Sequence, residues 1–449
     1  MTQYTGNERD IVVSQRVENR RRVVVTGLGA YTSLGETAQA TWQRALAGES
    51  GISRIEHWDP ASYDLPVAIG GEIKSIPDLP WLDSREARNI ARFARYAVVA
   101  AAEAMGDACL SSGDANYDSE RAGAIVGTAA GGMDVIAETT RTFDARGYRR
   151  ISPFFMVSFP HNMGTYHVAQ AFRLLGPSSA VSTACATGAQ AIADGAEFIR
   201  RGQADIMLAG GAEHAVFPLF IASFVAQKAA TTRGGDPTHA SRPFDGEREG
   251  FVVGDGAGIV VLEELEHALA RGATIYAELL GTGSSNDGYH PIAPEPEGRG
   301  ASFAISMALD DAGIAPEQVD YVNAHAASTP LGDAAETAAI KLALGEEHAR
   351  RIPISSTKSL IGHTMGAAGA IEAIMTVLSI RDNRVHPTLN QETPDPACDL
   401  DYVPNESRPV EVNIALKNSF GLGGQNAALI FGKWMGRNPS GWREGFRDR

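Results

Sequence analysis

The stretch "STACATGAQ" at residues 182–190 places a single cysteine, Cys185, among residues with very little side-chain volume. A β-branched run precedes it and an alanine-rich stretch follows, so this turn is expected where a buried strand passes into a helix. A cysteine there is either a small core residue or a nucleophile at a helix start. For an isolated cysteine the core interpretation is favoured, because reactive thiols are rare.

The same pattern occurs twice in the chain. "AVSTACATGAQAIADGAEFI" (180–199) and "PISSTKSLIGHTMGAAGAIEAI" (353–374) each pass from a strand through small polar residues into an Ala/Gly-rich helix. Short apolar runs alternate with helical patterns such as 93–108 and 188–202, which predicts an α/β protein. The repetition predicts two related halves whose sheets stack through shared glycine-rich helices. The expected strands are 21–29, 122–128, 178–184, 204–213 and 257–265 in the first half, and 274–285, 318–328, 352–359, 412–421 and 427–434 in the second.

Composition narrows the possible classes of protein. The chain has 449 residues, 44% apolar and 21% charged, which is typical of a globular protein that needs no disulfides. Its net charge of −15 argues against nucleic acid as the main partner. Neither a signal peptide nor an apolar run of about 18 residues is present, so no membrane association is expected. Three cysteines without C-x-x-C spacing favour a reducing compartment, which we take to be the cytoplasm.

The predicted organisation has four parts. Residues 1–20 are polar and are expected to form a flexible arm, and 434–449 a tail. Between them we expect an N-terminal half at 21–270 and a C-terminal half at 271–433.

Two histidines change the interpretation of Cys185. His325 lies in "YVNAHAASTPLGD" at the end of an expected strand, and His363 lies just inside the second strand–helix turn. A lone histidine in such a place is more often a core residue. Here the cysteine and both histidines follow the carboxyl ends of buried strands, where ligand sites of open α/β folds gather. Three such placements together favour a catalytic site.

Charged residues near the histidines are expected to be paired, because an unpaired charge among alanine and glycine is costly. They are Lys358, Asp333, Glu336 and Glu372. We predict a Lys358–Glu336 pair that orients His363, and a purely structural ion pair is an equally good interpretation.

Other motifs give weaker signals. "KNSFGLGGQN" (417–426) is a glycine-dense turn between two strands but lacks the Walker pattern of a phosphate loop. "GLGAYTSLG" (27–35) lacks the third glycine of a dinucleotide fingerprint, since Thr32 occupies that position. No cluster has the spacing of a zinc site, so no metal is expected.

Cys185, His325 and His363, each in its local string, resemble the Cys–His–His set of the β-ketoacyl-ACP synthases of the thiolase superfamily, and most of all the elongating type II branch (3-oxoacyl-ACP synthase II). The resemblance covers residues 21–433 and implies a thiolase-like fold, in which two similar βαβαβαββ halves stack as five layers (αβαβα). The motifs that carry it are "ISPFF" (151–155), "SRPFDGEREGFVVGDGAG" (241–258), "SSTKSLIGH" (355–363) and "NSFGLGG" (418–424).

The resemblance implies a decarboxylative Claisen condensation with malonyl-ACP that extends a fatty acid or a related polyketide chain. Cys185 would carry the acyl chain as a thioester. His325 and His363 would stabilise the enolate left by loss of CO₂ from malonyl-ACP. The backbone N–H groups of Cys185 and Phe420 would form the oxyanion hole, and Phe420 would gate the acyl pocket.

Further residues have supporting roles by the same resemblance. Lys358 and Glu336 would fix His363, and Thr329 would hold the phosphopantetheine arm. No cofactor is implied beyond the phosphopantetheine of the acyl carrier protein (ACP), which would be the partner of a homodimer. Because ACP is acidic, docking requires a local basic rim, for which the family pattern suggests Arg88, Arg149, Arg150 and Lys228.

Two departures from the family pattern concern the substrate. The family usually has His-Gly-Thr-Ser-Thr where this chain has Ala326 and Ala327 after His325, and usually Thr in place of Gln425. Loss of the hydroxyl at 327 removes one hydrogen bond to the phosphopantetheine arm, which costs about 0.5–1.5 kcal/mol. A specialised ketosynthase of secondary metabolism is therefore an alternative.

Three rival functions are less well supported. A thiolase needs a second cysteine in the last glycine loop, and Cys398 lies outside it. A Cys–His hydrolase leaves one histidine unexplained. A catalytically silent subunit that sets chain length typically lacks the nucleophile that Cys185 supplies.

Overall fold

The two halves of the chain build the same strand order in the computed structural model, which describes residues 20–77, 87, 89–111 and 116–436. The sheet order is β5-β4-β6-β7-β1 in the first half and β10-β9-β13-β14-β8 in the second. The strands of the first half are β1 (Val23–Thr32), β4 (Ala122–Gly127), β5 (Ser178–Ser179), β6 (Ile206–Glu213) and β7 (Gly256–Glu264). Those of the second half are β8 (Ala277–Asn286), β9 (Tyr321–Asn323), β10 (Ile354–Ser355), β13 (Ile414–Phe420) and β14 (Gln425–Lys433).

Pairing directions also match between the halves. The outer strands β5, β4 and β6 run parallel, as do β10, β9 and β13, and the remaining pairs are antiparallel. The halves meet where β1 pairs with β8 at only two positions, Val24↔Glu278 and Val25↔Ala277. Through this short pairing the strands of both halves form one ten-stranded sheet. Two small ladders lie outside it: β2 (Ser53–Arg54) with β3 (Ile69–Gly70), and β11 (Arg384–Val385) with β12 (Arg408–Pro409).

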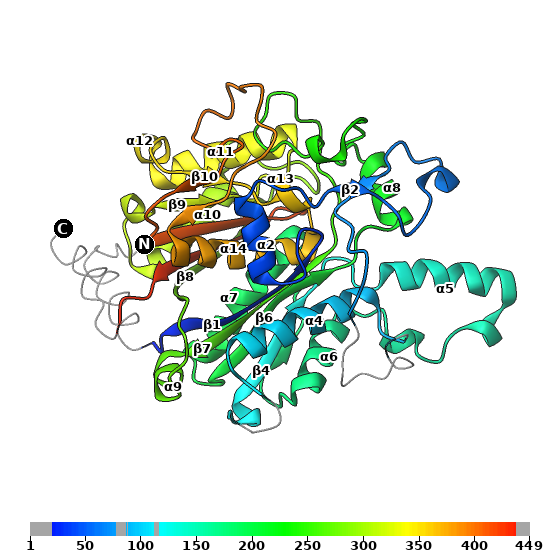
Figure 1. Ribbon diagram of the computed structural model, residues 1–449, viewed down its shortest axis with the longest axis horizontal. Coiled ribbons are helices and arrows are strands. Elements are labelled where there is room, and N and C mark those ends of the chain that lie inside the picture. Colours follow the sequence, from blue (N-terminus) through cyan, green and yellow to red (C-terminus); the bar gives the residue numbers. More distant parts are fainter. Residues whose placement is uncertain (1–19, 78–86, 88, 112–115, 437–449) are drawn as a thin grey trace, which may run out of the picture.

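Helices complete five layers, which confirms the predicted αβαβα architecture. α4 and α6 pack on the first-half strands, α10 packs on β8 and β14 with α11 against it, and α7 and α14 contact strands of both halves (Figure 1). The helices are α2 (Ala38–Leu46), α4 (Arg92–Asp107), α5 (Met133–Arg146), α6 (Met163–Phe172), α7 (Thr187–Arg200), α8 (Pro218–Ala226), α9 (Leu265–Ala270), α10 (Arg299–Ala312), α11 (Pro330–Leu344), α12 (Glu346–Ala349), α13 (Lys358–Ile361) and α14 (Ala368–Asp382).

Small residues make the middle layer possible. A Cβ on Gly188 of α7 would lie 2.6 Å from Ala370 N, and a Cβ on Gly369 of α14 would lie 2.6 Å from Ala189 N. The two helices therefore touch backbone to backbone through equivalent glycines. From Ala368 to Ile380, α14 is buried on every side, as expected from the small residues at its start.

Three strands are much shorter than predicted. β5, β9 and β10 span two, three and two residues, because the rest of each predicted run forms a turn at the carboxyl end of the strand. After β9, the backbone N–H groups of His325 and Ala326 donate to the Glu336 carboxylate instead of a neighbouring strand. The Glu336 side chain thus replaces strand pairing at the end of β9, where the predicted site residue His325 lies.

The predicted limit at residue 270 falls at the end of α9, between β7 and β8. Of the predicted arm and tail, residues 1–19 and 437–449 lie outside the described residues. Every helix of the described chain is too short or too polar to cross a bilayer.

Candidate active site

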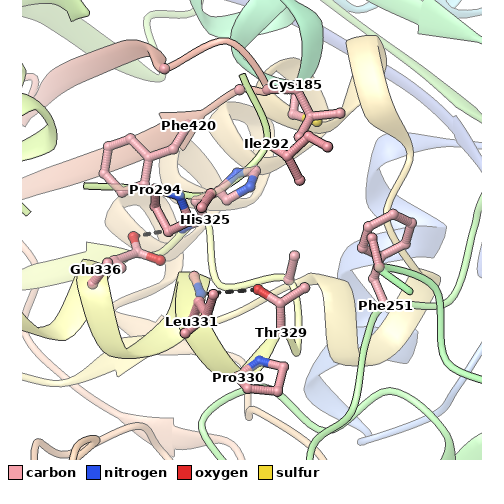
Figure 2. Close-up of a pocket in the computed structure, with 18 of the residues that line it drawn as sticks. Cys185, Phe251, Ile292, Pro294, His325, Thr329, Pro330, Leu331, Glu336 and Phe420 are labelled. Atoms are coloured by element: carbon pink, nitrogen blue, oxygen red, sulfur yellow. Dashed lines mark hydrogen bonds between the residues drawn. The ribbon is translucent and has the colours of Figure 1, made fainter. Parts of the chain in front are cut away.

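One cavity of about 390 Å³ brings most of the predicted site residues together. Those that line it are Cys185, His325, His363, Phe420, Thr329 and Glu336, drawn from both halves of the chain. Figure 2 shows Cys185 at the top of the view, His325 next to it, and Thr329 on the opposite side. Apolar side chains such as Phe224, Phe251 and Leu331 form much of the remaining wall. Such a wall with a few convergent polar groups is typical of a substrate site.

Cys185 lies in a short 3₁₀ turn, Ala184–Ala186, between β5 and α7. Ala184 has φ of +49°, which lets the chain reverse before the helix. Thr187 holds this turn, since its hydroxyl accepts from Thr183 N at 2.8 Å and donates to Ala184 O at 2.6 Å. The thiol is consequently fixed one turn ahead of α7.

A helix start favours a thiolate, but burial acts against the charged form at Cys185. Burial raises the pKa of the thiol to about 11, even though the Lys358 ammonium and the Leu422 N–H act in the opposite direction. The reason is that a buried anion loses its hydration, and the helix end offers too little in return. Cys185 is therefore a thiol until a substrate approaches.

His325 is held from three sides directly after β9. The backbone N–H of His325 donates to Glu336 Oε1 at 2.8 Å, and its backbone carbonyl accepts from Lys358 Nζ at 2.5 Å. Lys358 Nζ also lies 3.3 Å from His325 Nδ1. Because an ammonium group can only donate, Nδ1 accepts and the ring proton is on Nε2.

His363 has the same tautomer for a different reason. The backbone N–H of His363 donates to Val252 O at 2.7 Å. The ring atom Nδ1 accepts from the Met365 backbone N–H at 3.2 Å, so the ring proton is on Nε2. The ring lies 5.3 Å from the His325 ring and 5.2 Å from the Phe251 ring, in each case nearly perpendicular. The two imidazoles thus present two N–H donors in one cavity.

Burial keeps both rings neutral. It lowers the pKa of His325 and of His363 well below the usual value, and the nearby ammonium groups of Lys358 and Lys417 lower both further. Neutral imidazoles in a closed apolar site are suited to donate to a developing oxyanion.

The predicted Lys358–Glu336 pair is wrong, and so is its link to His363. Lys358 Nζ pairs with Glu372 Oε1 at 2.5 Å and contacts His325. Glu336 accepts the N–H groups of His325 and Ala326, and burial raises its pKa to about 7. The two charges are separated because Glu372, one helix turn inside α14, reaches the lysine first.

Asp333 supports a different part of the site. Its carboxylate accepts from Phe244 N at 2.8 Å and Thr329 N at 3.2 Å, and Arg248 Nε lies 3.5 Å away. Burial raises the pKa of Asp333 to about 6. Thr329 Oγ1 caps α11 by accepting from Gly332 N at 3.2 Å. Asp333 therefore fixes the loop between His325 and α11.

Phe420 ends β13 beside the histidines, with its ring 5.8 Å from the His325 ring. Gly421 follows so closely that its Cβ would lie 3.2 Å from Cys185 N. This packing brings the last glycine loop against the nucleophile turn. Ala327 is buried in the cavity wall, so a methyl group occupies the position of the expected hydroxyl.

Sequence reasoning missed Lys417 and Glu213. Lys417 is fully buried in β13 and lies 2.9 Å from Glu372 Oε2. Glu213, buried at the end of β6, accepts from Thr128 Oγ1 at 2.7 Å and Gly366 N at 3.1 Å. The signal was a charged residue within an expected buried strand, where a charge requires a partner.

The predicted basic rim is described in part. Arg149 and Arg150 are exposed in the turn Tyr148–Arg150, and Lys228 is exposed at the cavity wall. Arg88 lies outside the described residues. Among the residues that the structure describes, no His, Cys, Asp and Glu side chains group in a way that could hold a metal ion.

Two family models match most of the chain, up to residue 392. The β-ketoacyl synthase N-terminal domain matches residues 20–268, and the β-ketoacyl synthase C-terminal domain matches residues 276–392.

Curated relatives and a solved structure extend these matches. The chain is 46% identical over 416 residues to a 3-oxoacyl-[acyl-carrier-protein] synthase 2 of Synechocystis, covering 93% of this chain and 99% of the relative. It is 45% identical over 418 residues to the protein of the same name from Staphylococcus aureus strain N315, covering 93% and 100%. The fold is similar, with a TM-score of 0.86 and 36% identity over 92% of this chain and 100% of that one, to the ketosynthase AntDE solved with the type II polyketide acyl carrier protein AntF.

Proposed function

The chain belongs to the β-ketoacyl synthase family and is an acyl-transferring condensing enzyme, and from this premise we propose that Cys185, His325 and His363 carry out its reaction. The observation that supports this assignment most strongly is their meeting in one apolar cavity with both imidazoles as Nε2–H donors. The substrates are an acyl thioester and malonyl-ACP, and the product is 3-oxoacyl-ACP plus CO₂.

The first step is acyl transfer to Cys185. The sulfur attacks the thioester carbonyl of acyl-ACP, a new thioester forms on the enzyme, and the phosphopantetheine thiol leaves with the proton of Cys185. Because burial raises the pKa of Cys185 to about 11, the anion forms only during attack. The N–H groups of Cys185 and Phe420 face the developing oxyanion.

The second step is decarboxylation of malonyl-ACP. The bond to the carboxylate breaks, CO₂ leaves, and the electron pair forms an enolate at the thioester carbonyl. His325 and His363 each donate one N–H to the enolate oxygen, which a closed apolar site makes worth several kcal/mol.

The third step joins the two chains. The enolate carbon attacks the acyl carbonyl on Cys185, and the tetrahedral intermediate expels the sulfur as a thiolate that regains a proton. Phe420 gates the acyl side of the cavity, and Thr329 orients the phosphopantetheine arm. The proposed reaction uses no cofactor besides this arm. Lys358 acts through His325 rather than through His363.

Mass spectrometry of the intact protein tests the assignment. Incubation with acyl-ACPs of graded length should add the mass of one acyl group to Cys185, and malonyl-ACP should then remove it as 3-oxoacyl-ACP. A protein that gains no acyl mass under any of these conditions would contradict the proposal.

A role in polyketide synthesis is the second candidate. The AntDE ketosynthase acts with a type II polyketide carrier protein, and Ala326 and Ala327 depart from the usual pattern at the arm-binding loop. Repeated extension of one primer without reduction of the keto groups would favour this candidate, and a single extension per cycle would favour fatty-acid elongation.

Carrier docking is proposed at the exposed basic residues. Arg149, Arg150 and Lys228 offer positive charge on an otherwise acidic protein, and ACP is acidic. Reversal of Arg149 and Arg150 to Glu should raise the apparent KM for the carrier at low salt, and unchanged kinetics would rule out this patch.

A homodimer is proposed at the free edge of the first-half sheet. β5 is the last strand of the ten-stranded sheet, and α5 projects from the molecule in Figure 1. An open strand edge pairs readily with another chain, and exposed Phe143 on α5 and exposed Phe154 and Met156 in the segment between α5 and α6 add apolar surface. Light scattering should give twice the chain mass. We also place the protein in the cytoplasm, in keeping with its three free cysteines.

A further inference from the structure

One buried cation has no role in the chemistry above. Lys417 lies in the middle of β13, and its side chain is fully buried. Its Nζ is 2.9 Å from Glu372 Oε2 and 3.0 Å from Ser419 Oγ, and it also donates to Asn418 O. Burying an ammonium group is costly, so a fully buried lysine requires a compensating interaction.

Lys417 and Lys358 share a single carboxylate. Lys358 binds Glu372 Oε1 at 2.5 Å, while Lys417 binds the other oxygen, Oε2. The second carboxylate of the cluster, Glu336, is taken up by the N–H groups of His325 and Ala326, and burial raises its pKa to about 7. Burial lowers the pKa of Lys417, and the Glu372 carboxylate opposes this shift and favours the charged ammonium.

We propose that Lys417 is a positioning residue for the histidine pair. By occupying the second oxygen of Glu372, it leaves the Lys358 ammonium free to hold His325 and adds a charge that keeps both Nδ1 atoms unprotonated. This inference rests on the function proposed above, in which both rings donate from Nε2.

Protonation at Nδ1 would break the geometry of the pair. Nδ1 of His325 faces the Lys358 ammonium, and Nδ1 of His363 faces the Met365 N–H. A proton on either atom would set donor against donor and turn the ring away from the substrate. The charged and titratable groups that face the two rings are Lys358 from α13, Lys417 from β13, Glu372 from α14, Glu336 from α11 and Cys185 from the turn before α7.

The test is the pH dependence of malonyl-ACP decarboxylation. Lys417→Met removes the charge and keeps the apolar length of the side chain. The pH below which decarboxylation is lost (the acid limb) should rise by about one unit in this variant, because the Lys417 charge lowers the pKa of both imidazoles and its removal lets them protonate at higher pH. Lys341→Met is the matched control, since Lys341 pairs with Asp399 near the surface of α11. It should keep the wild-type profile.

A second readout separates positioning from general damage. Lys358 is the cation that acts on the Cys185 thiol, so alkylation of Cys185 by iodoacetamide in Lys417→Met should stay within about twofold of wild type. Lys417→Arg keeps the charge and should restore the wild-type acid limb. Lys417→Gln is the second neutral variant, and it should shift the limb as Lys417→Met does.

The outcomes are distinct. An unchanged acid limb in both neutral variants overturns the inference, as does loss of the thermal unfolding transition in both, which would give Lys417 a structural role. Wild-type protein that releases no CO₂ from malonyl-ACP would instead overturn the proposed function.

Discussion

The turn before α7 and the turn before α14 have nearly the same backbone but different contents. Each is a three-residue 3₁₀ turn that opens with a non-glycine residue in the left-handed region, Ala184 at φ +49° and Met365 at φ +47°. The second residue is Cys185 in the first turn and Gly366 in the other. The shared geometry therefore places a residue at the helix start, and the side chain decides what it does.

The surroundings of the two positions explain the difference. A Cβ on Gly366 would lie 2.5 Å from Ala129 N and 2.7 Å from Glu213 Oε2, whereas Cys185 faces the cavity. Glu213 accepts the Gly366 N–H and so clamps this turn to the first half. The catalytic side chain of the second half lies three residues earlier, at His363. The first half thus supplies the nucleophile Cys185, and the second half supplies the imidazole N–H donors of His325 and His363.

The largest effect is expected from Cys185→Ala. Condensation should fall by at least about 10³-fold, because among the described residues that line the cavity Cys185 is the one thiol that could carry the acyl chain. The measurement is 3-oxoacyl-ACP formation by mass spectrometry. The variant should fold normally, since alanine is smaller than cysteine. If the variant retained condensation, the turn before α7 would not supply the nucleophile.

Loss of one donor should have the next largest effect. His363→Ala should slow condensation by about 10²–10³-fold, the usual cost of one oxyanion donor. His325→Ala should slow it to a similar extent. Acylation of Cys185 by acyl-ACP, followed as mass added to the protein, should change much less in both variants. Equal losses in acylation and condensation would contradict the division of roles between the halves.

Gly366→Ala tests the other turn through stability. The added Cβ would press on Ala129 N and Glu213, so the free energy of unfolding should fall by about 1–3 kcal/mol. Cys185→Ala is the matched control at the equivalent position and should unfold within about 1 kcal/mol of wild type. Denaturant unfolding followed by circular dichroism gives both values. Equal free energies of unfolding in the two variants would show that the close packing of Gly366 against Ala129 and Glu213 does not contribute to stability.

The smallest effect concerns the thiol itself. Because burial raises the pKa of Cys185 to about 11, its thiolate fraction should rise about tenfold per pH unit from pH 7 to pH 10. The rate of iodoacetamide alkylation at Cys185 should follow this rise. A plateau near pH 8 would show instead that the free protein holds the anion.

Much of the fold could be predicted because strands covered on both faces are continuous apolar runs. The Ala/Gly composition of α7 and α14 likewise predicted the shared middle layer. Strand ends were harder, since β9 stops where Glu336, eleven residues after His325, takes the next N–H groups. Which charges pair depends on side-chain reach in three dimensions, so the partner of Lys358 could not be read from sequence spacing.

Release of CO₂ from malonyl-ACP, measured side by side in Cys185→Ala and His363→Ala, tests most directly whether the two halves divide the chemistry. Cys185→Ala should release CO₂ within about tenfold of wild type, and His363→Ala should fall by about 10²-fold or more. Loss of CO₂ release in Cys185→Ala with retention in His363→Ala would contradict this account.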